Sequence, residues 1–182
     1  MTLKKRVPVQ DQAREQLIIK LFGLSPNPER LGPDAFDNDN NPYELKSTTM
    51  SGIGTGRDVS LSMLNNWRKR YWLVAKGENL EDGFHPDEIY FLSPNMIEGR
   101  LKEIEEKIRP DLELRDTVLD LLNEDLSQNE LDQVDYLMSR GATLNNPKIS
   151  WLYIQENGVQ IQGDYIKTLR ELVTKYPLTS KE

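Results

Sequence analysis

The stretch Asp34–Thr48, DAFDNDNNPYELKST, most limits how this chain can fold. The run DNDNN consists of residues that favour turns and lies between two short segments, so it predicts a β-hairpin. A turn centred near Asp39 places Asp34 opposite Glu44. Two carboxylates that face each other at about 5 Å destabilise a hairpin unless a cation lies between them.

The second half of the expected hairpin adds a lysine to these carboxylates. Side chains alternate along a strand, so Glu44 and Lys46 share one face while Tyr43 and Leu45 point to the other. Mg²⁺ prefers hard oxygen ligands and takes one or two carboxylates, and Lys46 is placed to steer or deprotonate a metal-bound water. The arrangement is typical of phosphodiester hydrolysis. A solvated hairpin without any site is the alternative on this pattern alone.

The composition limits the partners and cofactors of such a site. The 182 residues include no cysteine and one histidine, His85, which excludes thiolate and multi-histidine metal sites. The net charge is −7, but the segment 57–76 carries +4, and a basic strip of this kind can contact phosphates. No apolar run reaches the roughly 20 residues of a membrane span, and the first residues lack a secretory signal. We expect a cytoplasmic protein with no membrane partner.

The expected order of elements predicts one domain, residues 1–182, of mixed α/β or α+β class with a central sheet flanked by helices. Apolar periodicity and turn residues indicate helices over 11–22 and 60–70 and strands over 71–76 and 88–92. Residues 51–58, rich in glycine, are expected to form a loop.

Residues 95–140 are expected to form an added helical segment. A first helix should end at Pro110, a second should cover 112–123, and a capping box of Ser127 and Glu130 should begin a third that ends at Gly141.

The last part of the chain is expected to begin with a strand pair. The stretches SWLYIQ and GVQI predict this β-pair around Asn157-Gly158. A terminal helix should follow it, and four of its residues should point inward: Ile166, Leu169, Leu172 and Val173.

The residues around the hairpin resemble a known nuclease motif. Pro33-Asp34 followed by Glu44–Lys46 resembles the PD-(D/E)xK nucleases, and the string DAFDNDNNPYELKS resembles the PvuII restriction endonuclease family, with the same ten-residue step from Asp to Glu. Two further stretches agree in order. Trp67-Arg68 precedes a strand that carries Trp72, and NNPKI at residues 145–149 precedes another strand.

The resemblance implies a restriction-endonuclease-like core and a homodimeric, Mg²⁺-dependent Type II restriction endonuclease, which cuts double-stranded DNA at a short palindrome. Asp34 and Glu44 would bind Mg²⁺ with the backbone carbonyl of Leu45, and Lys46 would serve the attacking water. The helix over 11–22 is the expected dimer contact, because it has an apolar face and because the family sets this precedent. A cognate DNA methyltransferase is expected as a functional partner and not as a stable subunit.

The resemblance also indicates which residues contact DNA. The histidine pair with which the family contacts bases falls near Arg57 and Asp58. Arginine can bind guanine O6 and N7, and aspartate can accept from the cytosine amino group, so a G·C pair is expected in the site. An Arg57 that pairs with Asp58 or a phosphate is the alternative, as is a solvated helix face for Arg68. The full set expected at DNA is Arg57, Asp58, Arg68, Asn145, Asn146 and Lys148.

Two other functions fit the same motif. One is a structure-specific repair or recombination nuclease of the same fold, which a defined band pattern on linear duplex would count against. The other is a non-catalytic DNA-binding module or nuclease partner subunit, which Mg²⁺ binding without cleavage would favour. The strongly acidic segment 95–140 is expected to face away from DNA in each case.

Overall fold

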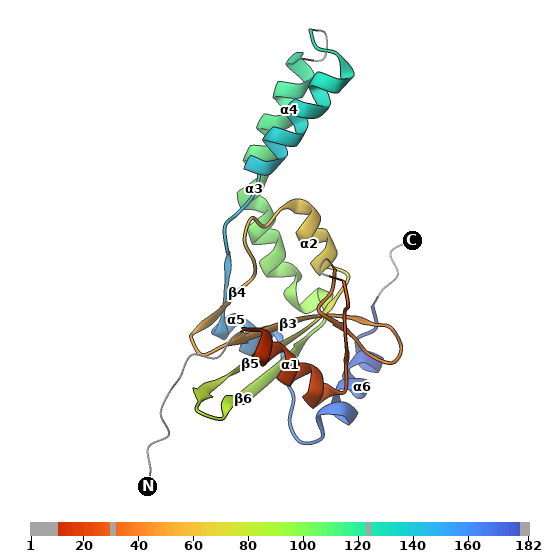
Figure 1. Cartoon of the computed structure of the whole chain (residues 1–182), viewed down its shortest axis with the longest axis vertical. Coiled ribbons are helices and arrows are strands. Elements are labelled where there is room, and N and C mark those ends of the chain that lie inside the picture. The colour runs from red at the N-terminus through yellow and green to blue at the C-terminus, as the bar shows by residue number, and fades with distance from the viewer. Residues whose placement is uncertain (1–10, 30–31, 123–124, 179–182) are drawn as a thin grey trace.

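The computed structural model describes residues 11–29, 32–122 and 125–178. A mixed six-stranded sheet forms the body, and a helical hairpin projects from it (Figure 1). The strand order is β1-β2-β3-β5-β6-β8, in which β3 and β5 are parallel and the other neighbours antiparallel. The strands of this sheet are β1 (Ser25–Pro26), β2 (Ala35–Phe36), β3 (Pro42–Thr48), β5 (Tyr71–Leu80), β6 (Gly83–Leu92) and β8 (Val159–Gln160). The predicted fold class is confirmed.

A second, two-stranded sheet pairs β4 (Gly52–Gly54) with β7 (Lys148–Ser150) in antiparallel register. Part of the glycine-rich segment 51–58, expected to be a loop, is therefore a strand. The pairing brings two segments that are far apart in the sequence side by side, which matters for the site described below.

Helices cover both faces of the larger sheet. On one face α1 (Asp11–Phe22) and α6 (Tyr165–Lys175) pack over the apolar side chains of β3, β5 and β6. On the other face lie α2 (Leu61–Trp67), α5 (Trp151–Asn157) and the first half of α3 (Pro94–Leu122). Burial of apolar surface in these two layers is the main force that holds the sheet in place.

The helix over 11–22 forms as predicted, but its apolar face packs against the core of its own chain. Ile18 and Phe22 are 1% and 2% exposed, and Leu17 and Leu21 pack against the same cluster. The apolar face is therefore not free for a second subunit. A dimer contact through α1 stays a prediction, but the apolar face of α1 does not support it.

The predicted hairpin register is also present. Ala35 lies opposite Tyr43 and Phe36 opposite Pro42, and Asp34 directly precedes the first of these paired residues. The backbone N–H of Asp34 donates to the carbonyl of Tyr43 at 2.8 Å.

The turn of the hairpin is held by the Asp37 carboxylate. It accepts hydrogen bonds from the backbone N–H groups of Asp39 and Asn41, each at 2.9 Å, and from the hydroxyl of Tyr43 at 3.0 Å. This carboxylate is therefore satisfied within the turn and has a structural role.

Pro110 does not end a helix, contrary to the sequence prediction. α3 is continuous from Pro94 to Leu122 and includes the segment 112–123 that was expected to be separate. Pro110 lies on an exposed face of α3, where water can replace the backbone hydrogen bond that a proline removes. The third predicted helix is present as α4 (Gln128–Gly141), with the capping box of Ser127 and Glu130.

The β-pair predicted over 150–161 is wrong. Residues 151–157 form α5, because the Ser150 hydroxyl accepts from the N–H of Tyr153 at 3.2 Å and caps the helix start. Trp151 and Ile154, one turn apart, are buried on one side. Gly158 ends α5, and β8 pairs with β6 instead.

The terminal helix α6 buries Leu169 and Leu172 as predicted. Val173 packs against the same core from a half-buried position. Ile166 was expected to point inward but is 41% exposed.

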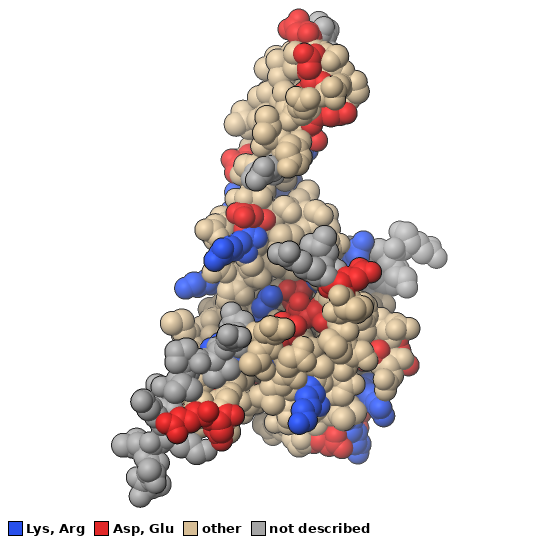
Figure 2. Space-filling model, in the orientation of Figure 1, with Lys and Arg blue, Asp and Glu red and all other residues tan. Residues whose placement is uncertain are grey.

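The distal part of α3 and α4 form the projecting hairpin (Figure 1). From residue 110 to residue 141 the sequence has nine acidic and two basic residues. Figure 2 shows acidic side chains along this hairpin. A surface of this charge repels DNA, and that it faces away from DNA stays a prediction. Within the described residues, no helix combines the length and the apolar character needed to cross a membrane.

Candidate active site

The site lies at an edge of β3 that no strand covers. β2 pairs only with Pro42 and Tyr43 at the start of β3. Beyond that point the Asp34 side chain occupies the edge, and its Oδ2 accepts from the backbone N–H of Leu45 at 2.7 Å. The hairpin register and this hydrogen bond together fix Asp34 beside Glu44.

The Glu44 carboxylate is held between two cations. Its Oε1 lies 2.7 Å from Nζ of Lys46, and its Oε2 accepts from Nη1 of Arg70 at 2.8 Å. Glu44 is 5% exposed, so these are partners of a buried charge. The short Glu44–Lys46 distance confirms that both side chains lie on one face of β3.

Arg70 belongs to the site although no local sequence pattern indicates it. The segment 68–70 reads as a solvated helix face, but Arg70 is 9% exposed and also donates to the carbonyl of Gly32 at 2.8 Å. The parallel register of β3 and β5 sets Tyr71 beside Tyr43 and so places Arg70, the residue before β5, next to the site. A pairing between distant strands has no local sequence signal.

The electrostatics of the site favour protonation of Asp34 and of Lys46. Burial and then the neighbouring Glu44 charge raise the pKa of Asp34 to about 6, although Lys46 acts in the opposite direction. Burial lowers the pKa of Lys46, but Glu44 and Asp34 outweigh it, so that this pKa is raised and the side chain is an ammonium group at neutral pH.

The donor set fits a hard divalent cation. Asp34 and Glu44 offer carboxylate oxygens. The Glu44 charge raises the pKa of Asp34, because two negative charges repel each other, and a bound cation would offset this repulsion. Among the described residues, no group of three or more acidic, histidine or cysteine side chains is placed to hold a metal ion. Two carboxylates with waters, and with the Leu45 carbonyl predicted as a third ligand, are what Mg²⁺ typically accepts.

A cavity of about 360 Å³ opens beside Lys46 and brings predicted DNA contacts to the site. Arg57 and Asn146, which come from segments far apart in the sequence, both line it. Thr55 holds the two segments together, because its N–H and its hydroxyl both donate to the carbonyl of Pro147, at 3.3 and 2.7 Å. A backbone bridge between Val59 and Leu144 adds a second connection.

The other residues expected at DNA do not line this cavity. Asp58 and Asn145 are exposed neighbours of Arg57 and Asn146, and Lys148 pairs with Gly54 across the small sheet. Asp58 and Asn146 have φ values of 49° and 46°, a backbone conformation that is uncommon outside glycine and frequent at functional loops.

Arg68 is engaged elsewhere. Its guanidinium binds Glu98 at 2.9 Å and Glu105 at 2.6 Å, both on α3. The structure therefore does not bring Arg68 to the cavity, and a phosphate contact would have to compete with two carboxylates.

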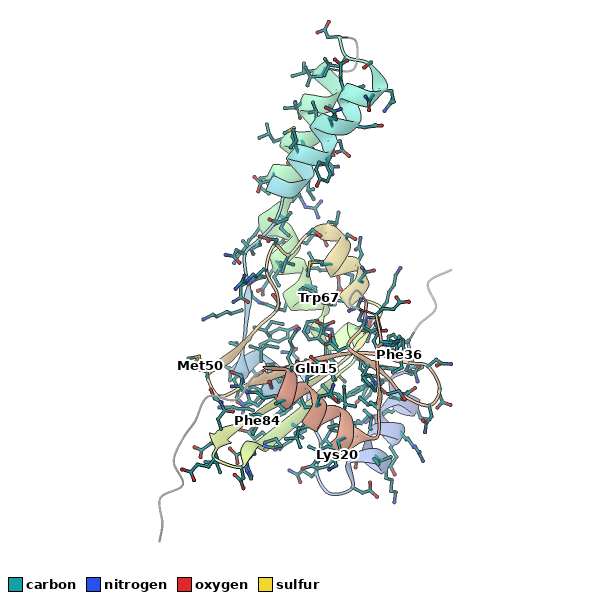
Figure 3. The ribbon with its side chains drawn as sticks, in the orientation of Figure 1. Glu15, Lys20, Phe36, Met50, Trp67 and Phe84 are labelled. Atoms are coloured by element: carbon teal, nitrogen blue, oxygen red, sulfur yellow. The ribbon has the colours of Figure 1, made fainter. Side chains whose placement is uncertain are left out.

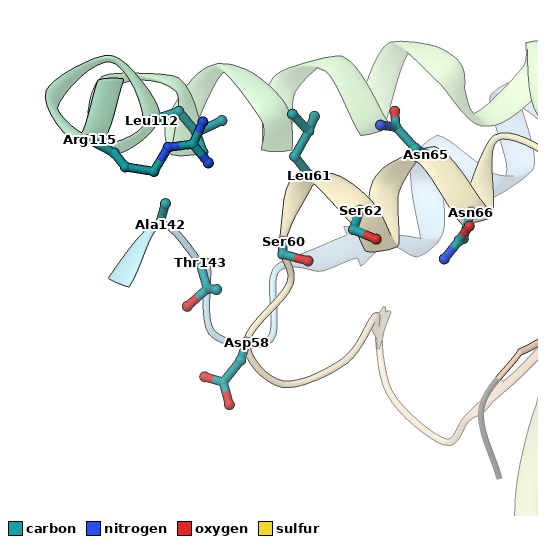
Figure 4. Close-up of a pocket in the computed structure, with 10 residues that line it drawn as sticks. All are labelled: Asp58, Ser60, Leu61, Ser62, Asn65, Asn66, Leu112, Arg115, Ala142 and Thr143. Carbon is teal, nitrogen blue, oxygen red and sulfur yellow. The ribbon is translucent and has the colours of Figure 1, made fainter. Parts of the chain in front are cut away.

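A larger cavity, about 810 Å³, lies between α2 and the root of the projecting hairpin (Figure 4). Its lining includes Ser60, Asn65 and Arg115 but none of Asp34, Glu44 or Lys46. Size alone would favour this cavity, whereas the half-buried Lys46, which pairs with Glu44, lines the smaller one. The chemistry of the side chains decides for the smaller cavity.

The geometry agrees with a comparison to known families. The model of the family described as restriction endonuclease PvuII matches residues 8–162. The chain belongs to the PvuII restriction endonuclease family. The match includes the β3 edge, both strands of the small sheet and the projecting hairpin. A comparison with curated proteins found no match.

Asp34→Asn should stabilise the folded nuclease at high pH. The raised pKa means that folded protein keeps a proton that unfolded protein releases between about pH 4 and pH 6, so the free energy of unfolding falls by about 3 kcal/mol as pH rises through this window. The free energy of unfolding of the variant should not show this fall. In urea unfolding it should exceed that of wild type by about 3 kcal/mol at pH 8 and by much less at pH 4.

The matched control is Asp39→Asn, at an exposed position of the same turn. It should leave the pH dependence of the wild type unchanged. An Asp34→Asn difference that is equal at both pH values would contradict the raised pKa.

Arg70→Ala should destabilise the fold by about 3 kcal/mol, because it leaves the buried Glu44 charge with one cationic partner instead of two. Lys69→Ala, one residue away and exposed, is the control and should change stability by less than about 0.5 kcal/mol. Chemical denaturation at pH 8 measures both. Equal effects of the two variants would show that Arg70 does not hold Glu44.

Proposed function

We propose that this protein is a Mg²⁺-dependent Type II restriction endonuclease that hydrolyses phosphodiester bonds of double-stranded DNA at a short palindromic sequence. The observation that carries the proposal is the side-by-side placement of Asp34, Glu44 and Lys46 at the open edge of β3, next to Arg57 and Asn146. Membership of the restriction endonuclease family supports the same reaction.

Each side chain of the site has a distinct task. Asp34 and Glu44 bind the cation, which would polarise the scissile phosphate and lower the pKa of the attacking water. Lys46, kept as an ammonium group, donates hydrogen bonds to the phosphate or to that water. Arg70 stays on the protein side of Glu44 and holds that carboxylate in the orientation that faces Asp34.

The loops at the small sheet supply sequence recognition. Arg57, Asp58, Asn145 and Asn146 lie on two segments that Thr55 joins to one another beside the catalytic cavity. Arg57 would bind guanine O6 and N7, and Asp58 would accept from the cytosine amino group. Two copies related by a two-fold axis would place one site on each strand of a palindrome, and a methyltransferase of the same specificity would protect the host DNA.

The decisive experiment uses phage or plasmid DNA with wild type and with Lys46→Ala, each with Mg²⁺ and with EDTA. Wild type with Mg²⁺ should produce discrete fragments. Lys46→Ala should cleave at least about 100-fold more slowly, because a positioned proton donor contributes that much or more to such a step. Lys69→Ala, an exposed lysine off the site, should cleave as wild type does.

The fragment pattern separates the alternatives. Ends that share one short symmetric sequence support a restriction enzyme, whereas preference for branched DNA over linear duplex would indicate a structure-specific nuclease. Intact DNA under all conditions would contradict the proposal for this chain acting alone and would favour a binding module or a subunit that needs a partner.

Arg57→Ala should lower cleavage at the recognised sequence by about 10- to 100-fold, since one bidentate base contact contributes roughly 1–3 kcal/mol. Non-specific binding should change little. Arg170→Ala, an exposed arginine on α6, is the control for the loss of one positive charge. Gel shifts with specific and random duplexes measure both. An equal loss on both duplexes would assign Arg57 to a phosphate.

A further inference from the structure

Glu15 on α1 lies at the cavity that Lys46 also lines. It lies one turn before Ile18 and Ile19, which fix α1 in the core at 1% and 6% exposure. Glu15 lines the same cavity as Lys46 and Ser47, and Figure 3 labels it on the part of α1 that lies over the sheet. A helix anchored in this way holds the carboxylate at a defined position.

The charge of Glu15 is coupled to the site. Burial raises its pKa, while Lys46 lowers it and Glu44 raises it further. Glu15 in turn contributes to the raised pKa values of Asp34 and Lys46. Among the described residues, no hydrogen bond or ion pair joins Glu15 to a partner, so its charge is available to the cavity.

A cation at Asp34 and Glu44 would change the surroundings of Lys46. In the structure the Lys46 ammonium group is paired with Glu44 at 2.7 Å. A divalent cation held by the two carboxylates would offset their negative charge and add positive charge beside the ammonium group. Lys46 would then need another negative charge to keep it at the cavity.

We propose that Glu15 is a positioning residue, which holds the Lys46 ammonium group at the cavity once Asp34 and Glu44 bind the cation. The inference rests on the proposed function of these three residues. Glu15 belongs to α1 and lines the cavity beside Lys46, whereas Glu44 pairs with Lys46 from the same strand. The cavity therefore holds a second carboxylate for Lys46, one that a cation at Asp34 and Glu44 would leave free.

This role predicts opposite effects on cleavage and on DNA binding. Glu15→Gln removes the charge that keeps Lys46 in place, so single-turnover cleavage with Mg²⁺ should slow by about tenfold. The same variant removes a negative charge beside the DNA phosphates, so the Kd for duplex DNA with Ca²⁺ should stay equal or become smaller. Loss of a merely structural contact would weaken binding and lower the melting temperature as well.

Glu171→Gln is the matched control, because it removes one exposed carboxylate on α6, away from the site. It should leave cleavage unchanged. Cleavage by Glu15→Gln at the wild-type rate would overturn the proposal while leaving the nuclease function intact.

A second measurement does not depend on activity. The double variant Asp34→Asn, Glu44→Gln neutralises the two carboxylates that the cation would occupy. In its crystal structure Nζ of Lys46 should lie within about 4 Å of a Glu15 oxygen, the distance of an ion pair. Lys46 directed away from Glu15 in that structure would overturn the inference, even if wild type showed no cleavage on any DNA.

Discussion

The buried Glu44 carboxylate, held between Lys46 and Arg70, is the interaction on which the site depends. A charge that is 5% exposed is costly without partners, and each of its oxygens has a cation at 2.7 or 2.8 Å. Lys46 lies on β3 and Arg70 directly precedes β5, so the parallel pairing of these strands and the position of the carboxylate fix each other. Asp34 completes the arrangement through the backbone of Leu45.

The same sheet edge brings the proposed catalytic and recognition residues together. β3 is open beyond Tyr43 because β2 has only two residues, so a substrate can approach Lys46 at the edge. The small sheet then brings the segments of Arg57 and Asn146 to this edge, although one follows β3 directly and the other follows the projecting hairpin. The acidic hairpin lies apart from this cavity and carries a charge that DNA avoids.

The sequence predicted what depends on local pattern and missed what depends on distant pairing. The hairpin register, the shared face of Glu44 and Lys46 and the α4 capping box follow from spacing and turn chemistry, and all are present. The prediction that Pro110 ends a helix was wrong because an exposed helix face tolerates a proline. The strand prediction for residues 151–157 was wrong because it relied on Asn157-Gly158 and overlooked Ser150 as a helix cap. Arg70 and Glu15 had no local signal, since only β5 and α1 packed on β3 place them at the site.

A calorimetric titration with Mg²⁺ at pH 6 and pH 8 tests most directly whether the two carboxylates form a cation site. With the pKa of Asp34 near 6, binding should release about half a proton at pH 6 and almost none at pH 8. The double variant Asp34→Asn, Glu44→Gln should show no binding heat at either pH. Equal binding by wild type and the double variant would contradict the account, because the cation would then lie elsewhere in the protein.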